Sequence, residues 1–247
     1  MPDKLVYGLI GHPLSHSFSQ RYFTEKFQRE RIDADYLNFD ISDIASLPTL
    51  LSQTPGLRGF NVTIPYKQSV IPFLKNIEGD AAEIGAVNVV KVNKDYSLSG
   101  YNSDVYGFIE AIKPLLINRQ YRSALVLGTG GASRAVCFGL EKLGIRVSQV
   151  SRHPSTGQYA YSDLTEDVIK EHDIIVNTTP LGMYPAVETH PDILYSAITP
   201  EHVCFDLVYN PDETVFMKLC AQKGATVSNG LRMLHLQAER AWQIWNE

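Results

Sequence analysis

The sequence predicts an α/β protein built from two α/β domains. Short runs of β-branched or aromatic residues alternate with longer amphipathic stretches along most of the chain, which is typical of βαβ units packed on a parallel sheet. The strand candidates are too numerous for one small sheet, and a new βαβ run with its own glycine-rich turn begins near Tyr121. A chain of 247 residues is long enough for one large domain or two small ones.

In the first part of the chain, short alternating runs predict strands and amphipathic stretches predict helices. Residues 60–64 show the strand pattern, because apolar and polar side chains alternate there with a period of two. Pro65 ends that strand because it has no N–H to donate. The predicted strands are 4–10, 34–39, 57–63, 87–92 and 97–100, and the predicted helices are 17–31, 42–53 and 67–74.

The second part of the chain continues the same alternation. Its predicted strands are 123–128, 145–150, 173–176, 203–207 and 225–227, and its predicted helices are 103–117, 131–143, 212–223 and 229–245. The last helix opens with Ser228, Asn229 and Gly230, which are typical helix-start residues, and then spaces its apolar residues at helical intervals. From the residues alone, this helix fits either domain. We expect the two domains to join between Asn102 and Asp104.

The composition favours a cytoplasmic protein that acts on a small molecule. Hydrophobic residues make up 44% of the chain and charged residues 20%, as in ordinary globular proteins. A net charge of −5 argues against nucleic acid or an anionic membrane surface as a partner. The apolar stretch near the N-terminus is too short for a signal peptide, and no stretch approaches the roughly eighteen apolar residues of a membrane span.

Cysteine and histidine spacing gives no indication of a metal site or a disulfide framework. The three cysteines, Cys137, Cys204 and Cys220, are scattered and form no C-x-x-C pair, so we expect small buried side chains. His12 and His16 lie four residues apart, but Pro13 makes a helix there improbable and no further ligand is close in sequence. We therefore expect no bound metal.

The stretch SALVLGTGGASRA, residues 123–135, has the pattern of a dinucleotide-binding turn. An apolar strand runs into glycines and then into a helix, so Gly128 would allow the tight turn and Gly130 would let a pyrophosphate approach the backbone. The helix from Gly131 would direct its N–H groups and positive dipole end at the anion. Ser133 occupies the sixth position of the fingerprint, where glycine or alanine is usual.

The end of the next strand favours NADP over NAD. NAD enzymes carry an acidic residue there for the ribose 2′-hydroxyl, whereas this chain has Ser151 followed by Arg152. A guanidinium can bind a 2′-phosphate through two hydrogen bonds, while a carboxylate would repel it. The alternative is that Arg152 is a surface charge.

Polar clusters follow several other predicted strands, and each has a structural alternative. The serines of GHPLSHSFSQ, residues 11–20, are suited to binding a carboxylate or a polyol, and equally to capping the following helix. Asn88, within an apolar strand, is satisfied by backbone groups or meets a ligand. Lys67 is by default a solvated loop charge. The carboxyl ends of strands are nevertheless where open α/β sheets bind ligands.

Taken together, these stretches resemble the shikimate dehydrogenase family. They are GHPLSHSFS, GFNVTIPYK, GAVNVV, YNSDVYG, GTGGASRA, SRH, NTTPLGM, DLVYNPDET and NGLRMLHLQA, in family order between residues 11 and 238. The resemblance implies an N-terminal substrate domain, residues 1–102 and 229–247, and a Rossmann-like NADP-binding domain, residues 103–228. It also implies that the last helix returns to the first domain. The activity implied is NADP-dependent interconversion of 3-dehydroshikimate and shikimate in aromatic amino-acid (chorismate) biosynthesis, by a monomer or homodimer.

The resemblance also assigns roles to individual residues. It makes Lys67 and Asp104 the catalytic pair, with Lys67, by our hypothesis, the principal proton-transfer residue. Residues implied to bind the substrate, or to help position it, are Ser15, Ser17, Asn61, Thr63, Asn88, Tyr209 and Gln237. Residues implied to bind the cofactor are Gly128, Gly130, Gly131, Ala132, Ser133, Arg134, Ser151, Arg152, Thr178 and Gly230.

The chain departs from the family pattern at a few positions. Ser103 replaces a threonine and keeps the hydroxyl, whereas Val89 and Gln20 replace a usual threonine and proline. The family's Asn-Arg-Thr phosphate cluster is 151–153, Ser-Arg-His, in this chain, which leaves one clear guanidinium. The alternatives are a quinate/shikimate dehydrogenase with broader substrate or NAD use, and a dinucleotide-binding sensor without turnover.

Overall fold

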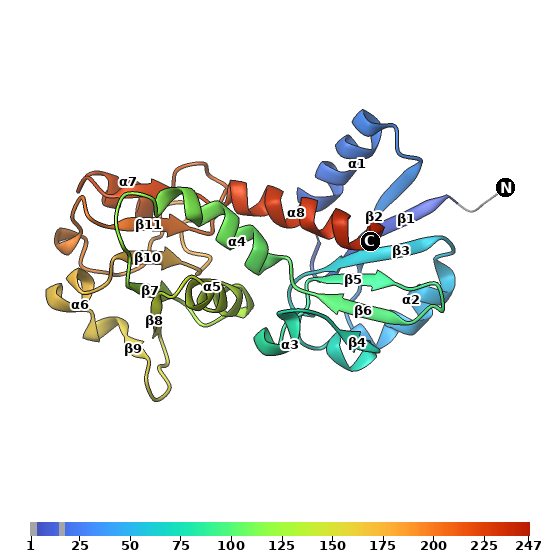
Figure 1. Cartoon of the computed structure of the whole chain (residues 1–247), viewed down its shortest axis with the longest axis horizontal. Coiled ribbons are helices and arrows are strands. Elements are labelled where there is room, and N and C mark those ends of the chain that lie inside the picture. The colour runs from blue at the N-terminus through green and yellow to red at the C-terminus, as the bar shows by residue number, and fades with distance from the viewer. Residues whose placement is uncertain (1–3, 15–17) are drawn as a thin grey trace. The chain divides into compact units, whose positions relative to one another are not determined.

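The computed structural model describes residues 4–14 and 18–247, and these fold into two compact units. The first unit comprises Met1–Ser103 and Ala238–Glu247, and the second comprises Asp104–Gln237. Each unit is built on one six-stranded sheet, and Figure 1 shows the strands and helices of each. The α/β class and the two-domain build predicted from the sequence are confirmed.

The first unit has a mixed sheet in the order β2-β1-β3-β5-β6-β4. Its strands are β1 (Leu5–Gly11), β2 (Ala34–Asp40), β3 (Leu57–Val62), β4 (Asn76–Ile77), β5 (Val89–Val92) and β6 (Leu98–Tyr101). β1 pairs in parallel with β2 and β3, whereas β5 is antiparallel to both β3 and β6. The expectation of parallel sheets is therefore wrong for this unit. The turn from Asn93 to Ser97 is too short for a parallel crossover and makes β5 and β6 a hairpin.

Helices and short 3₁₀ turns cover both faces of this sheet. They are α1 (Phe18–Glu30), η1 (Ile44–Ser46), α2 (Leu47–Gln53), η2 (Ile71–Phe73) and α3 (Ala81–Ile84). Side chains alternate along β1, so Tyr7 and Leu9 pack with α1 and the end of the last helix, while Ile10 packs with Leu47 of α2. The unit therefore has one core on each side of its sheet.

The helix predicted over residues 67–74 is wrong. Only Ile71–Phe73 are helical, as a 3₁₀ turn, and residues 67–70 form turns. The backbone bonds there run mostly from residue i to i−3, as from Phe73 N to Val70 O at 3.0 Å. Pro72 has no N–H to continue an α-helical ladder, which explains why this segment remains short.

The second unit has a fully parallel sheet in the order β12-β11-β10-β7-β8-β9. Its strands are β7 (Ser123–Leu127), β8 (Arg146–Ser151), β9 (Tyr159–Ala160), β10 (Ile174–Asn177), β11 (Val203–Asp206) and β12 (Thr226–Ser228). β7 is buried throughout. Leu125 and Leu127 pack on the face covered by α6 and α7, while Ala124 and Val126 pack on the face covered by α4 and α5. Burial on both faces explains the continuous apolar run of this strand.

The helical segments of the second unit are shorter than the sequence predicts. They are α4 (Asp104–Ile112), η3 (Lys113–Leu115), α5 (Gly131–Lys142), η4 (Tyr161–Asp163), α6 (Glu166–Lys170), η5 (Tyr195–Ala197) and α7 (Val215–Ala221). α7 begins three residues later than expected because the Thr214 side chain caps it by accepting from Met217 N. The short segments β4, α3, β9 and α6 were not predicted, since pieces of two to five residues carry little periodicity.

The last helix, α8 (Leu231–Asn246), contributes to both units. In the second unit it packs closely on α4, because a Cβ on Gly107 would lie 2.7 Å from Met233 O. In the first unit Trp245 is buried and donates its indole N–H to Val90 O at 3.0 Å. The predicted return of this helix to the first domain is confirmed. Among residues 4–14 and 18–247, no helix is both long and apolar enough to cross a membrane.

Candidate functional site

The glycine-rich turn of the second unit begins where β7 ends. Gly128 has φ +113°, a conformation that side chains other than glycine rarely adopt. A Cβ there would also lie 2.7 Å from Thr178 Oγ1, and the Thr178 hydroxyl donates to Leu127 O at 2.7 Å. Two residues predicted to bind the cofactor, Gly128 and Thr178, thus lie side by side although 50 positions apart in sequence.

The first turn of α5 fits the pyrophosphate of a dinucleotide. Gly130 is the N-cap of the helix and has no side chain to cap it, so the first N–H groups of the helix keep their donor capacity. A Cβ on Gly130 would meet nothing within 4 Å, which leaves open space beside these donors. The following Ala132 is half-buried, Ser133 is buried and Arg134 is exposed. Backbone donors, open space and a helix N-terminus together suit an anion.

The end of β8 lies next to this turn. β7 and β8 are paired in parallel, with Leu127 opposite Val150, and Gly128 N donates to Val150 O at 2.9 Å. Ser151 is buried and its hydroxyl accepts from His153 N at 3.2 Å, while Arg152 is exposed. The structure therefore brings the glycine-rich turn and the start of the Ser-Arg-His segment to the same sheet edge.

A buried polar cluster ties together the two loops that follow β10 and β11. Asp206 accepts from the Thr214 hydroxyl at 2.6 Å, from Val208 N at 3.0 Å and from Asn177 Nδ2 at 3.0 Å. Asn177 Oδ1 in turn accepts from Thr179 N and from the Thr179 hydroxyl. Burial raises the pKa of Asp206 to about 6, and the three donors only partly oppose that shift.

This cluster was not predicted from the sequence. Asn177 and Asp206 were recognised only as parts of polar stretches after strands, but they face each other across the β10–β11 pairing and are fully buried. A signal was present, because each ends an otherwise apolar strand, and a buried amide or carboxylate requires hydrogen-bond partners. Their role in the structure is to hold the two loops to each other.

Three further predicted residues lie on or after the β11 loop. Burial raises the pKa of the half-buried Tyr209 phenol. Gly230 N donates to Val208 O at 3.2 Å, and a Cβ on Gly230 would overlap the Leu207 carbonyl, so only glycine fits. Gln237 lies on α8 against α4, where its Cβ would be 3.1 Å from a Cβ on Gly107.

In the first unit, predicted substrate residues also make contacts within the protein. Asn61 Oδ1 accepts from the Tyr36 hydroxyl at 2.8 Å, and Asn61 Nδ2 donates to Asn88 O at 3.3 Å. Thr63 N donates to Ile10 O at 2.9 Å, which leaves the half-buried Thr63 directly after the end of β3. These contacts fix the amide of Asn61 at the carboxyl end of β1 and β3.

Asn88, directly before β5, is joined to Ser103, the residue before α4. Its Oδ1 accepts from Ser103 N at 2.7 Å, and its Nδ2 donates to the Ser103 hydroxyl at 3.1 Å. The Asn88 amide therefore bonds the backbone N–H and the hydroxyl of Ser103, and its contact with the substrate stays a prediction. The Lys67 carbonyl accepts from Val87 N at 2.7 Å, so the backbone of Lys67 is tied to the residue before Asn88.

The predicted serine loop is described only in part. Asp40, at the end of β2, accepts from Leu14 N at 2.9 Å and contacts His12 Nδ1 at 2.6 Å. Hydrogen bonds from these groups hold the pKa of the Asp40 carboxyl below its usual value. Ser15 and Ser17 lie outside the described residues. Lys67 belongs to the first unit and Asp104 to the second, so their pairing stays a prediction.

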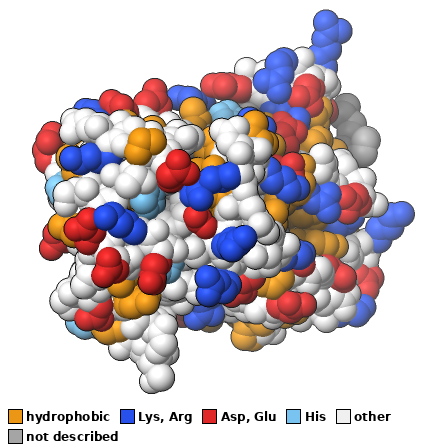
Figure 2. Space-filling view, turned by 60° about the vertical axis from the view of Figure 1, so that its left-hand side comes forward, with side chains coloured by type: hydrophobic (Ala, Val, Ile, Leu, Met, Phe, Trp, Pro, Cys, Tyr) orange, Lys and Arg blue, Asp and Glu red, His pale blue; other side chains and the backbone are white. Residues whose placement is uncertain are grey.

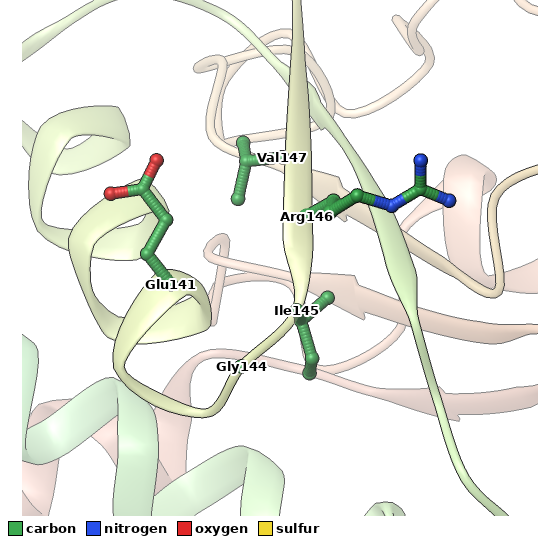
Figure 3. Close-up of a pocket in the computed structure, with 5 residues that line it drawn as sticks. All are labelled: Glu141, Gly144, Ile145, Arg146 and Val147. Atoms are coloured by element: carbon green, nitrogen blue, oxygen red, sulfur yellow. The ribbon is translucent and has the colours of Figure 1, made fainter.

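Other surface features do not coincide with these residues. A hollow lined by Glu141, Gly144, Ile145, Arg146 and Val147 lies where α5 turns into β8, at the end of that strand away from the glycine-rich turn. Figure 3 shows the Glu141 and Arg146 side chains pointing away from each other. Acidic and basic side chains are interspersed on the face shown in Figure 2. Among the residues that the structure describes, no three His, Cys, Asp or Glu side chains are grouped as a metal site.

Comparison with known proteins covers both units of the chain. The family profile described as "Shikimate dehydrogenase substrate binding domain" matches residues 9–90. A shikimate dehydrogenase (NADP(+)) of Caldanaerobacter subterraneus subsp. tengcongensis is 36% identical, over 97% of this chain and 91% of that protein. The chain belongs to the shikimate dehydrogenase family.

Solved structures of the family have the same fold. Shikimate 5-dehydrogenase of Thermus thermophilus, in complex with NADP(H) and shikimate, has a TM-score of 0.85 and 31% identity, covering 98% of this chain and 93% of that one. Quinate dehydrogenase of Corynebacterium glutamicum, in complex with NAD, has a TM-score of 0.87 and 30% identity, with the same coverage of 98% and 93%. The shikimate dehydrogenase resemblance read from the motifs is confirmed.

Proposed function

We propose that this member of the shikimate dehydrogenase family is an NADP-dependent oxidoreductase that interconverts 3-dehydroshikimate and shikimate by hydride transfer. The observation that carries the proposal is the full-length likeness to a protein named shikimate dehydrogenase (NADP(+)), which extends through both units. The glycine-rich turn, the open first turn of α5 and Arg152 at one sheet edge support it. The product of the reaction would enter the shikimate pathway of aromatic amino-acid biosynthesis.

Cofactor binding is assigned to the edge of the parallel sheet. The backbone of Gly128, Gly130, Gly131, Ala132, Ser133 and Arg134 would receive the pyrophosphate. Arg152 beside Ser151 would bind the 2′-phosphate, with Thr178 nearby, and Gly230 would lie near the nicotinamide amide. NADP, when bound, supplies the hydride acceptor or donor of the reaction. Substrate binding and proton transfer are carried out by side chains of the protein.

Substrate binding and proton transfer are assigned mainly to the first unit. Ser15 and Ser17 would hold the substrate carboxylate, and Asn61, Thr63, Asn88 and Gln237 would meet its hydroxyls or position it. Tyr209 would line the pocket. Lys67 would take the hydroxyl proton as the alcohol is oxidised and return it in the reverse direction, with Asp104 orienting its ammonium group.

We also propose a domain division, a location and an assembly. The substrate domain would comprise residues 1–102 and 229–247, and the NADP domain residues 103–228. The net charge of −5 and the small-molecule chemistry support a cytoplasmic enzyme. Its assembly would be a monomer or a homodimer.

A quinate/shikimate dehydrogenase is the second candidate, because the quinate dehydrogenase structure matches as well as the shikimate dehydrogenase structure does. Ser151 argues against the NAD-preferring form, since no carboxylate stands there for the ribose hydroxyls.

The test is a four-way comparison of purified protein by NADPH or NADH absorbance, with shikimate or quinate as substrate and NADP or NAD as cofactor. We expect the highest kcat/KM with shikimate and NADP. A higher value with quinate would establish the second candidate. NADPH binding without turnover of any pair would show a sensor instead of an enzyme.

A further inference from the structure

A head-to-tail chain of hydrogen bonds runs through the edge of the parallel sheet. Ser155 N donates to Gln158 Oε1 at 3.0 Å, and Gln158 Nε2 donates to Gln149 Oε1 at 3.2 Å. Gln149 Nε2 donates to Ser133 Oγ at 3.0 Å, and the Ser133 hydroxyl donates to Gly128 O at 2.8 Å. Each side chain in the sequence accepts one bond and donates the next, an arrangement in which neighbouring bonds polarise one another.

The two ends of this chain lie in the two cofactor segments. It ends at the carbonyl of Gly128, in the turn assigned to the pyrophosphate. It begins at Ser155, in the loop 152–158 that starts with the arginine assigned to the 2′-phosphate. The chain thus links Ser133, a departure from the dinucleotide fingerprint, to the loop that follows the Ser-Arg-His segment.

The loop 152–158 has few other contacts to hold it. Its residues from Arg152 to Gly157 are exposed, and its base is held by the pairing of β8 with β9, where Val150 lies opposite Tyr159. Within the loop, Gln158 N donates to Ser155 O at 3.0 Å. The two glutamine side chains add a bond from this turn to the interior of the sheet, where Ser133 is fully buried.

We propose that Gln149 and Gln158 are positioning residues for NADP, which hold the loop 152–158 at a set distance from the glycine-rich turn so that the 2′-phosphate meets Arg152. This inference rests on the proposed function. Neither glutamine needs to touch the cofactor. A loop held in place before binding loses less conformational entropy when the ligand binds. The two glutamines, here called the glutamine brace, therefore strengthen binding of the 2′-phosphate selectively. With the loop held in this way, the single guanidinium of Arg152 is enough to bind the 2′-phosphate, where the family pattern has further polar groups.

The test measures binding of two nucleotide fragments by calorimetry, adenosine 2′,5′-bisphosphate and adenosine 5′-monophosphate, which differ only in the 2′-phosphate. The variants are Gln149→Met, which breaks the chain in its middle, Gln158→Met, which breaks it at the half-buried outer end, and Ser133→Ala, which breaks it at the inner end. Gln222→Met, at an exposed position after α7, is the matched control. Thermal unfolding of every variant reports whether the fold is kept.

Each of the three variants removes two bonds of the chain, and we expect each to weaken binding of the bisphosphate by about three- to tenfold. Binding of the monophosphate should change by less in Gln149→Met and Gln158→Met. With saturating NADPH, kcat of these two variants should be kept while KM for NADPH rises.

If Gln149→Met and Gln158→Met weaken binding of both nucleotides equally, or change the binding of neither, the inference is overturned. A merely structural role does not single out the 2′-phosphate. If Gln149→Met unfolds, Gln158→Met alone decides, since it removes only the two outer bonds, from Ser155 N and to Gln149 Oε1. The wild type separates the two proposals: failure to bind the bisphosphate more tightly than the monophosphate would count against the proposed NADP function itself.

Discussion

The two units fasten the polar ends of their strands in different ways. In the second unit, Asp206, Asn177 and Thr214 bind one another in a buried cluster, and none of them is assigned to the cofactor. In the first unit, Asn61 and Asn88 are assigned to the substrate, yet their side chains also bind Tyr36 and Ser103. The Asp206 cluster of the second unit thus holds the scaffold without an assigned ligand contact, whereas Asn61 and Asn88 of the first unit combine the two roles.

Because of this difference, the effect of a substitution on stability can be separated from its effect on ligand binding in one unit more easily than in the other. In the second unit, the network can be perturbed without removing an assigned ligand contact, so changes in stability and in binding can be measured independently. In the first unit, one substitution changes both at once. The predictions below test this contrast, from the largest expected effect to the smallest.

The largest effect is expected for Lys67→Ala. Removing the proton-transfer group should lower kcat by about 10²- to 10⁴-fold, while the dissociation constant of adenosine 2′,5′-bisphosphate stays unchanged because that ligand is assigned to the other unit. Steady-state kinetics and calorimetry measure the two quantities. Lys94→Ala, at an exposed lysine of the same unit, is the control and should keep its activity. Near-normal turnover of Lys67→Ala would refute the catalytic role.

The next effect is a pH dependence of stability due to Asp206. Its pKa is raised by burial to about 6 in the folded protein, so the folded state holds this proton more tightly than the unfolded state does. The contribution to the free energy of unfolding is therefore present below the ordinary pKa of about 4 and is lost as pH rises through about 6.

Asp206→Asn lacks this titration, so the wild type should lose about 3 kcal/mol relative to the variant between about pH 3 and pH 7.5. Urea unfolding at both pH values measures this difference. A difference that does not change with pH would mean that the pKa of Asp206 is the same in the folded and unfolded protein, so that its three hydrogen-bond donors fully offset the effect of burial.

Asn88→Ala tests whether the first unit combines scaffold and ligand contacts. The loss of the bonds to Ser103 should lower the free energy of unfolding by about 1–3 kcal/mol, because Ser103 N is left without that acceptor in a buried position. KM for shikimate should rise in the same variant. Asn76→Ala, at an exposed asparagine of β4, should change neither quantity. A change in stability with no change in KM would mean that Asn88 has only a scaffold role, and the contrast between the two units would then fail at this residue.

The smallest effect is expected for Thr178→Val, which replaces the hydroxyl by a methyl group of similar shape. The Leu127 carbonyl keeps its bond from Thr178 N and loses only the bond from the Thr178 hydroxyl. The free energy of unfolding should therefore fall by only about 1 kcal/mol. Calorimetry should show a modest weakening of NADPH binding. Thr226→Val, at an exposed residue of the edge strand β12, controls for the loss of a threonine. Unchanged binding would remove Thr178 from the cofactor set.

Much of the architecture follows from local sequence features. The continuous apolar run of β7 reflects a strand that is buried on both faces, and the alternation in residues 60–62 of β3 reflects burial of one face. The helical spacing of apolar residues in α8 reflects burial of one stripe of that helix. The glycine-rich turn is equally local, since the φ of Gly128 is one that glycine alone adopts readily.

The tertiary structure decided what depends on pairing across the chain. The antiparallel placement of β5 beside β3 joins segments about thirty residues apart, and the sequence pattern of a strand does not say which neighbour it takes. Asp206 and Asn177 are 29 residues apart, and the glutamine brace spans residues 128–158, so neither shows as a local motif. The sequence by itself determined the longer strands and helices and the glycine-rich turn, but not the short segments β4, α3, β9 and α6. Only folding decided which polar side chains share a buried site, because hydrogen-bond partners there are chosen by position in space.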